Sequence, residues 1–240
     1  MIESVNNDRV KYWCKLNDRK YQDLEEKFLV EGEHLVSEAY KTKNLIEVII
    51  LDGYDFDYEN KTYVSKSVMK KISALTTTPK IIGVVKKTKS TDIFGRVLIL
   101  DAIQNPGNMG TILRSAVAFN IDTVIVGTGS VSIYNSKVIR ASEGMLFKLN
   151  IVESSLDVIF DELHKDGYKI MSTSVTDGVD IKKVKVPLKS AIVIGNEGSG
   201  ISEFVKKNTD EFIHIKMNEL CESLNVGVAT SIILYELNND

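Results

Sequence analysis

Three short segments of the chain combine polar side chains with glycine, as ligand-binding loops do, and each follows an apolar run. The first, at 101–115, contains the turn-forming pair Pro106-Gly107, with Asn108 as the predicted N-cap of a helix. Arg114 then lies on an otherwise apolar helix start, beside the end of a strand. An arginine in that place is suited either to holding an anion or to pairing with a carboxylate elsewhere in the fold.

The second segment, 195–202, contains three glycines in six residues. Glycine lets backbone N–H groups come close to a ligand. The spacing is GxxGxG and no Gly-Lys-Ser/Thr follows, so the segment matches neither the dinucleotide fingerprint nor the P-loop. Glu197, in the middle, would repel a pyrophosphate. The segment therefore suits a cofactor with a cationic part and few phosphates, unless it is a simple turn without a ligand.

The third segment, 215–225, leads into the last helix, which is expected from about 224 to 237 with Ser223 as its N-cap. That helix is apolar nearly all round, which predicts that it is buried. Asn225 at its start then needs a hydrogen-bond partner, because burying an amide without one is costly.

Alternating strand-like and helix-like stretches must position these loops. Apolar runs predict strands at 97–101, 123–127, 149–152, 168–173, 191–195 and 212–215. Helical periodicity predicts helices at about 109–119, 135–142, 155–165 and 201–207. The alternation predicts an α/β fold, with a mostly parallel sheet and helices on both faces. Ligands of such sheets bind beyond the carboxyl ends of the strands, where all three segments begin.

The first part of the chain shows the same alternation on a smaller scale. Strands are predicted at 28–32, 45–51 and 81–85, and helices at 33–40 and 65–73. The stretch that follows the strand at 81–85, up to residue 96, has no apolar periodicity and contains Ser, Thr, Asp and Gly, as linkers do. We therefore expect a small α/β domain at 1–90, a linker at 91–96 and a second domain at 97–240.

The formal net charge of the 240 residues is −3, which on its face argues against a nucleic-acid partner. The charge is unevenly spread, however: residues 1–95 carry 16 Lys or Arg and 15 Asp or Glu, against 14 and 18 in residues 96–240. No acidic residue lies between Glu59 and Asp92, a window that holds eight lysines. That window is either a solvated surface or a contact for an RNA backbone. The lysines predicted to bind RNA are Lys70, Lys71, Lys86 and Lys87.

Other kinds of site are disfavoured. Cys14 and Cys221 lie far apart in the sequence and have no Cys or His partners at metal-ligand spacing, so neither a disulfide nor a metal site is expected. The N-terminus has no apolar run for a signal peptide, and no stretch approaches the ~18 apolar residues of a membrane span. We expect a cytoplasmic protein with neither a metal nor a membrane partner.

Together, the three segments resemble in order and spacing the motifs of the SpoU (TrmH-like) RNA 2′-O-ribose methyltransferases of the SPOUT class. The motifs are NPGNMGTILR at 105–114, IGNEGSGIS at 194–202, and ESLNV followed by VA within 222–229. The N-terminal part resembles the ribosomal-protein-like substrate-binding domain of the same family. It does so through SVNNDRVK at 4–11, FLVEG at 28–32 and TTP at 77–79.

The resemblance implies a deep trefoil knot in the second domain, a homodimer, and S-adenosylmethionine bound among the knot loops. By position, the residues that would line the cofactor pocket are Gly195, Ile215 and Leu224. Those that match the catalytic and RNA-binding polar residues of the family are Asn108, Arg114, Glu197, Ser223 and Asn225. The sequence departs from the family pattern at Lys216, usually Pro, at 218–220, usually small residues, and at Gly227, usually Ser.

The implied reaction transfers a methyl group to a ribose 2′-OH, which must lose its proton as it attacks. A guanidinium is a poor proton acceptor. We therefore infer that Arg114 grips the adjacent phosphate and lowers the pKa of the hydroxyl, with the proton passing to a phosphate oxygen or water. Ser223 and Asn225 would orient the ribose, and Glu197 would order the glycine loop or Arg114.

The expected substrate is 23S rRNA, because the additional N-terminal domain is commoner among the rRNA enzymes of this family than among the minimal tRNA ones. A tRNA 2′-O-methyltransferase is the alternative enzyme. Two other classes of protein also remain. One is an inactive RNA-binding protein of the same fold, and the other is a nicotinamide-dependent oxidoreductase, whose glycine fingerprint the first loop lacks.

Overall fold

The computed structural model of the protein describes residues 1–175 and 177–238. Its chain divides into two compact units. Unit 1 comprises residues 1–88 and 132–147, and unit 2 comprises residues 89–131 and the chain from 148 onward. Within the described residues, every helix is too short or too polar to cross a membrane.

Unit 1 is built on a four-stranded sheet in the order β1-β4-β2-β3. Its strands are β1 (Lys27–Glu31), β2 (Leu45–Leu51), β3 (Lys61–Val64) and β4 (Ile81–Lys86). β4 is antiparallel to both of its neighbours, whereas β2 and β3 are parallel. β1, β2 and β4 lie where the sequence predicts strands, but β3 is not predicted, because its KTYV sequence is short and buries only Val64.

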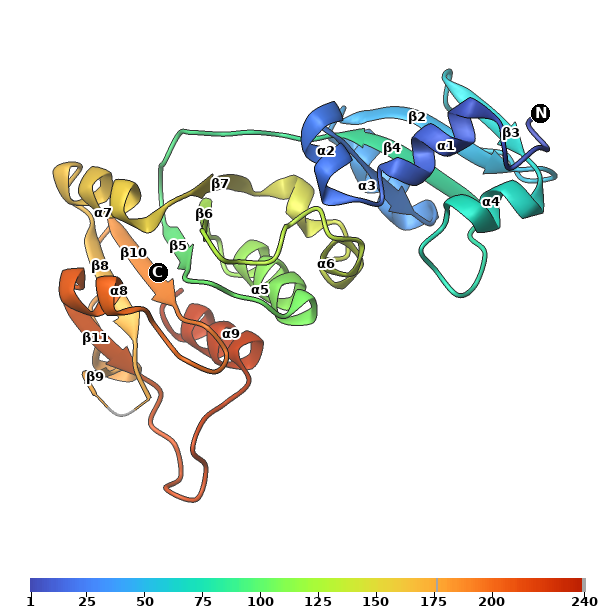
Figure 1. Ribbon diagram of the computed structural model, residues 1–240. Helices are drawn as coiled ribbons and strands as arrows, with labels where there is room; N and C mark the ends of the chain where they lie inside the picture. The colour runs from blue at the N-terminus through green and yellow to red at the C-terminus, as the bar shows by residue number, and fades with distance from the viewer. Residues whose placement is uncertain (176, 239–240) are drawn as a thin grey trace. The chain divides into compact units, whose positions relative to one another are not determined.

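Four helices at the start of the chain cover this sheet (Figure 1). They are α1 (Asp8–Lys15), α2 (Arg19–Glu25), α3 (Glu33–Lys41) and α4 (Lys66–Ile72). Ser65 caps α4 as predicted, since its hydroxyl accepts from Val68 N. The sequence does not predict α1 and α2, which are short and mostly polar. Each begins at a capping side chain, and α1 is anchored by Val10 and Trp13 in the core.

A segment from the later part of the chain completes unit 1. Residues 132–147 contain α6 (Ser136–Ala141) and lead into the 3₁₀ helix η1 (Met145–Lys148). The ring of Phe28 lies 4.7 Å from that of Tyr134 and 6.2 Å from that of Phe147, measured between centroids. These aromatic contacts join the segment to the N-terminal sheet, so the compact unit extends beyond the predicted domain at 1–90 to include residues 132–147.

Unit 2 contains a seven-stranded sheet in the order β7-β6-β5-β10-β8-β11-β9, and every neighbouring pair is parallel. Its strands are β5 (Val97–Leu100), β6 (Thr123–Gly127), β7 (Asn150–Ser154), β8 (Lys169–Thr173), β9 (Val179–Asp180), β10 (Ser190–Ile194) and β11 (Glu211–His214). All residues of β5, β6 and β10 are buried. The predicted parallel α/β fold is confirmed, with the two-residue β9 as an unpredicted addition.

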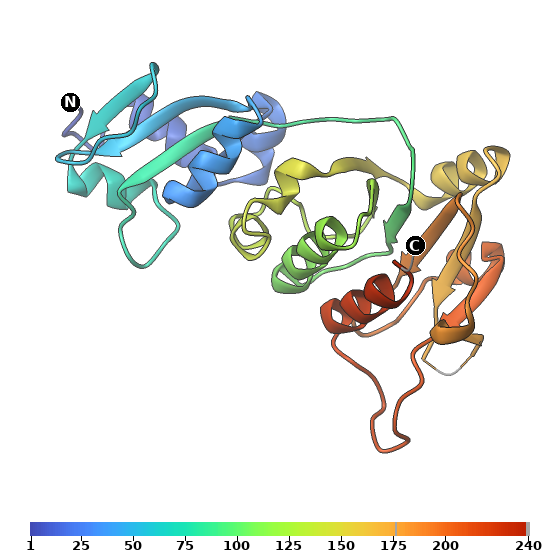
Figure 2. The ribbon, with the colours of Figure 1, turned by 180° about the vertical axis from the view of Figure 1, so that it is seen from behind.

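Helices cover both faces of this sheet, as predicted. They are α5 (Pro106–Ala118), α7 (Leu156–Lys165), α8 (Glu203–Asn208) and α9 (Val226–Glu236). One core cluster joins α7 and α8 to Val97 and Ile99 of β5. The alternate residues Leu98 and Leu100 point to the opposite face. There α5 lies beside α9 in both views (Figures 1 and 2), with Ser115 and Ser231 hydrogen-bonded at 2.7 Å.

The prediction that α9 is buried is wrong for one of its faces. Its inner residues, which include Ile233 and Leu234, are buried. Val228, Ile232 and Tyr235 are 48%, 38% and 67% exposed. They are spaced by four and three residues and so lie on one side of the helix. An all-apolar helix leaves such a stripe open when only one side packs on its own chain.

Candidate functional site: a cavity at the carboxyl edge of the parallel sheet

A cavity of about 490 Å³ lies in unit 2 at the carboxyl ends of β8, β10 and β11. Its walls include the glycine loop 195–201 and part of the long loop 215–225, which runs from β11 to α9 (Figure 1). All three predicted cofactor residues, Gly195, Ile215 and Leu224, line it, together with Ser223 and Glu197. The structure thus brings two of the three sequence segments to a single cavity.

The glycine loop is closed on itself by hydrogen bonds. Asn196 and Gly200 exchange backbone hydrogen bonds of 2.8 and 3.0 Å. The Asn196 side chain accepts from Gly198 N at 2.9 Å and donates to Ala102 O at 2.7 Å. A Cβ on Gly195 would lie 2.3 Å from the carbonyl carbon of Gly200, so only glycine fits there. The loop is therefore preformed and tied to the end of β5.

The carboxylate of Glu197 joins the glycine loop to the start of α5. Its Oε1 accepts from Asn105 N at 3.0 Å and from Asn108 Nδ2 at 3.1 Å, and its Oε2 accepts from Gln104 N at 3.2 Å. Partial burial by itself raises the pKa of Glu197, but these donors outweigh it and lower the pKa below its usual value. Glu197 is therefore held as an anion at neutral pH, beside the positive end of a helix dipole.

Asn108 extends this network to the third segment. Its Oδ1 accepts from Asn225 Nδ2 at 2.9 Å, so Glu197, Asn108 and Asn225 form a continuous hydrogen-bonded chain. The partner predicted for Asn225 therefore exists, although Asn225 itself is exposed. Asn225 also accepts from Gly227 N and Val228 N.

Both predicted helix caps are displaced. Asn105 rather than Asn108 caps α5, because Pro106 occupies the first helical position, where its missing N–H costs nothing. Asn225 rather than Ser223 caps α9. The Asn-Pro pair is the sequence signal that would have located the first cap. Asn105 and Asn196, which fix the loops, were not among the predicted site residues.

Arg114 stands apart from this network. It is exposed on α5 and makes no hydrogen bond or ion pair within residues 1–175 and 177–238. Six residues separate it from Asn108, so at 3.6 residues per turn the two side chains leave the helix about 120° apart. The contact between Glu197 and Arg114 that the sequence left open is therefore not formed. The guanidinium is free to bind an anion from solution.

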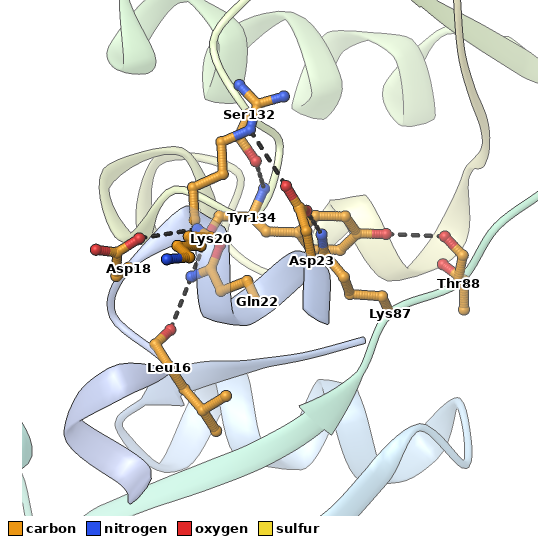
Figure 3. Close-up of polar contacts among 10 residues, drawn as sticks. Leu16, Asp18, Lys20, Gln22, Asp23, Lys87, Thr88, Ser132 and Tyr134 are labelled. Carbon is orange, nitrogen blue, oxygen red and sulfur yellow. Dashed lines mark hydrogen bonds and ion pairs between the residues drawn. The ribbon is translucent and has the colours of Figure 1, made fainter. Parts of the chain in front are cut away.

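The four lysines predicted to bind RNA belong to unit 1, and they divide into two kinds. Lys70 and Lys71 in the last turn of α4 and Lys86 at the end of β4 are exposed. Lys87 is only 7% exposed. Figure 3 shows its ammonium against Asp23, at 2.5 Å, and it also lies 4.4 Å from the centre of the Tyr134 ring. Lys87 therefore differs from the three exposed lysines predicted to bind RNA, because its charge is used inside unit 1.

Within the described part of the chain, no group of three or more His, Cys, Asp or Glu side chains is placed to hold a metal ion. The cavity instead combines an aliphatic wall, a preformed glycine loop and an anionic carboxylate. Such a site can hold a flat organic group and a cationic centre. The amides of Asn108 and Asn225, linked by hydrogen bonds to Glu197 of the lining, can orient hydroxyl groups beside the cavity.

Comparison with known proteins decides the family. Residues 95–235 match the model of the SpoU rRNA Methylase family, and residues 7–83 match that of the MRM3-like substrate binding domain. The chain belongs to the SpoU rRNA methylase family. The family resemblance inferred from the three motifs and from the N-terminal part is thereby confirmed, and these family matches leave no support for an oxidoreductase.

Relatives of this family match over nearly the full chain. The 23S rRNA (guanosine(2553)-2′-O)-methyltransferase RlmP of Bacillus subtilis is 33% identical over 98% of each chain. A TrmH-family structure from Porphyromonas gingivalis has a TM-score of 0.88 at 29% identity, covering 98% of each chain. The SpoU methyltransferase AviRb of Streptomyces viridochromogenes, solved in complex with AdoMet, has a TM-score of 0.88 at 21% identity over 97% of each chain, which speaks to the fold alone.

Proposed function

We propose that this SpoU-family protein transfers a methyl group from S-adenosylmethionine to a ribose 2′-OH of 23S rRNA. The observation that carries this proposal is the hydrogen-bonded chain Glu197–Asn108–Asn225 at the rim of the cavity. It unites the three motif segments at one point, beside a cavity whose aliphatic and glycine walls suit the cofactor. The 23S rRNA substrate is supported by the full-length match to RlmP.

The cavity is chemically suited to S-adenosylmethionine. Gly195 leaves no room for a side chain, so the backbone of the glycine loop forms part of the wall. Ile215 and Leu224 provide apolar surface, and Glu197 provides a negative charge near a cationic group. When bound, the cofactor supplies an electrophilic methyl group on a sulfonium. The bulkier residues at 216–220 do not line the cavity, apart from Met217.

The residues of the chain would position the ribose and favour the loss of its proton. The Asn225 and Asn108 amides, fixed by Glu197, would hold the ribose near the cavity mouth, and Ser223 lies on the same loop. Arg114, exposed on α5 and without an ion pair among the described residues, would bind the adjacent phosphate and lower the pKa of the 2′-OH. The proton then leaves to a phosphate oxygen or to water, because a guanidinium is a poor proton acceptor.

Unit 1 would bind the RNA outside the reacting nucleotide. Lys70, Lys71 and Lys86 are exposed and lie in the sequence window that carries no acidic residue. Cations of this kind bind phosphates and release counterions, which gives salt-dependent affinity without sequence selectivity. The match of residues 7–83 to a substrate binding domain supports this assignment.

We further propose that the protein is a homodimer and that unit 2 contains the trefoil knot of its family. The exposed apolar stripe of α9, formed by Val228, Ile232 and Tyr235, supports a second copy as its cover. Ile232→Glu should then shift the sedimentation coefficient from dimer to monomer. A wild-type monomer in sedimentation velocity would contradict the dimer, and a crystal structure whose chain does not thread through the 195–225 loops would contradict the knot.

Calorimetric titration of the wild-type chain tests the cofactor assignment. We expect S-adenosylmethionine to bind with measurable heat and to raise the melting temperature. No heat and no stabilisation would contradict the proposed function. Binding of S-adenosylmethionine without methyl transfer to any RNA would favour the inactive RNA-binding protein.

A further inference from the structure

His214 lines the cavity with a ring nitrogen that the protein itself does not use. It is the last residue of β11, between Ile213 and Ile215. Its Nδ1 atom is buried and has no hydrogen-bond partner among the residues that the structure describes. A buried imidazole nitrogen without a partner opposes folding, because it loses its hydrogen bond to water. In a ligand cavity, this observation points to a partner supplied by the ligand.

The surroundings of His214 indicate which part of the cofactor meets it. Its chain neighbours Ile213 and Ile215 also line the cavity, and Ile213 is fully buried. A flat, largely apolar group with hydrogen-bonding edges fits such a wall. The amino-acid end of the cofactor needs charged partners instead. The lysine of the lining, Lys206, already pairs with Glu203.

The strand order separates His214 from the reacting end of the site. The glycine loop with Glu197 follows β10, and β8 lies between β10 and β11. Neighbouring strands are ~4.8 Å apart, so the ends of β10 and β11 lie roughly 10 Å from each other. The network around Glu197 is thus at one side of the cavity and His214 at the other. An elongated ligand is needed to reach both.

We propose that His214 Nδ1 forms a hydrogen bond with the adenosine part of S-adenosylmethionine and so positions the cofactor. This inference rests on the proposed function. A neutral imidazole either donates or accepts at Nδ1, and adenosine offers both kinds of partner. No motif of the sequence singles out His214, because an isolated histidine at a strand end carries no pattern.

The test is calorimetric titration of the full chain with S-adenosylhomocysteine and with adenosine, neither of which has a methyl group to transfer. His214→Phe keeps a ring and removes both nitrogens, whereas His214→Asn keeps a polar atom at the δ position. We expect His214→Phe to weaken both ligands about 5–10-fold and His214→Asn to restore most of the affinity. The control His34→Phe, at an exposed histidine of unit 1, should bind as the wild type does.

Unchanged affinity in His214→Phe would overturn the inference. A loss for S-adenosylhomocysteine but not for adenosine would overturn the assignment to the adenosine part. If His214→Phe does not fold, nitrogen NMR of the wild type decides, since the chain has only three histidines. We expect ligand to shift the His214 Nδ1 signal, and no shift would overturn the inference. A wild type that binds neither ligand would contradict the proposed function instead.

Discussion

Replacing Glu197 by Gln removes the charge that joins the glycine loop to α5. The carboxylate oxygens accept from Asn105 N and Asn108 Nδ2 on one side and from Gln104 N and Asn196 Nδ2 on the other. A Gln side chain has one oxygen, so its NH₂ group would face two donors. Solvent screening weakens charge-assisted hydrogen bonds at this exposed carboxylate, so the loss of two of them costs about 1–2 kcal/mol. For a chain of this size, we expect the Tm to fall by about 2–8 °C at pH 7.

The dependence on pH distinguishes this cause from a general packing defect. The donors hold the pKa of Glu197 below its usual value. Its stabilisation is therefore fully present above the unfolded pKa of ~4.3 and is lost as the pH falls through the lower folded pKa. The difference in Tm between wild type and Glu197→Gln should accordingly shrink below about pH 4.

Thermal melts followed by circular dichroism at pH 7 and in a series down to acid pH measure both effects. The matched control is Glu203→Gln, the first residue of α8, which follows the glycine segment. Its carboxylate is mostly exposed and forms a solvent-exposed ion pair with Lys206 three residues on, so its removal should change the Tm little. Equal Tm values of the two variants at pH 7 would refute the reasoning. So would a Tm difference between wild type and Glu197→Gln that persists to the lowest pH at which the protein folds.

Three further outcomes follow from the geometry. Replacing the exposed Lys70, Lys71 and Lys86 together by Gln should reduce the salt dependence of RNA binding by up to about three phosphate contacts, whereas Lys87→Met should lower stability and leave the salt dependence unchanged. Filter binding at several salt concentrations measures this dependence, and an unchanged slope in the triple Gln variant would place the RNA elsewhere. A fragment of residues 1–88 should be much less stable than unit 1 in the full chain, because it lacks the aromatic partners of Phe28; full native stability in urea titration would contradict this. Arg114→Lys should lower methyl transfer and leave cofactor affinity intact, whereas near-normal turnover with a shifted pH profile would count against bidentate gripping of the phosphate.

Much of the fold was predictable from the sequence because its strands are continuous apolar runs. The runs at 97–100 and 191–194 fit central strands of a covered sheet, and the structure buries every residue in both. The short elements were not predicted because they bury few apolar side chains. α2 buries only Gln22, so its seven residues carry no apolar periodicity to detect.

The site was predictable where local chemistry determined it and not where long-range contacts did. The glycine loop was predictable from its spacing, and the motifs singled out Asn108 and Asn225, although the hydrogen bond between them was seen only in the structure. The burial of Lys87 depends on Tyr134, which lies in a segment that joins unit 1 from elsewhere in the chain (Figure 3). Counting charge along the sequence could not distinguish this buried lysine from the exposed Lys86 beside it.

The most direct test of the proposed activity is methyl transfer to RNA. The purified protein would be incubated with labelled S-adenosylmethionine and with 23S rRNA from cells that lack the enzyme, and the modified nucleotide would then be mapped. We expect the label on a single ribose 2′-oxygen, where it blocks alkaline cleavage of the following phosphodiester; guanosine 2553, named for the Bacillus subtilis relative, is the first position to check. Label on a base, or on tRNA and not on 23S rRNA, would contradict the proposal.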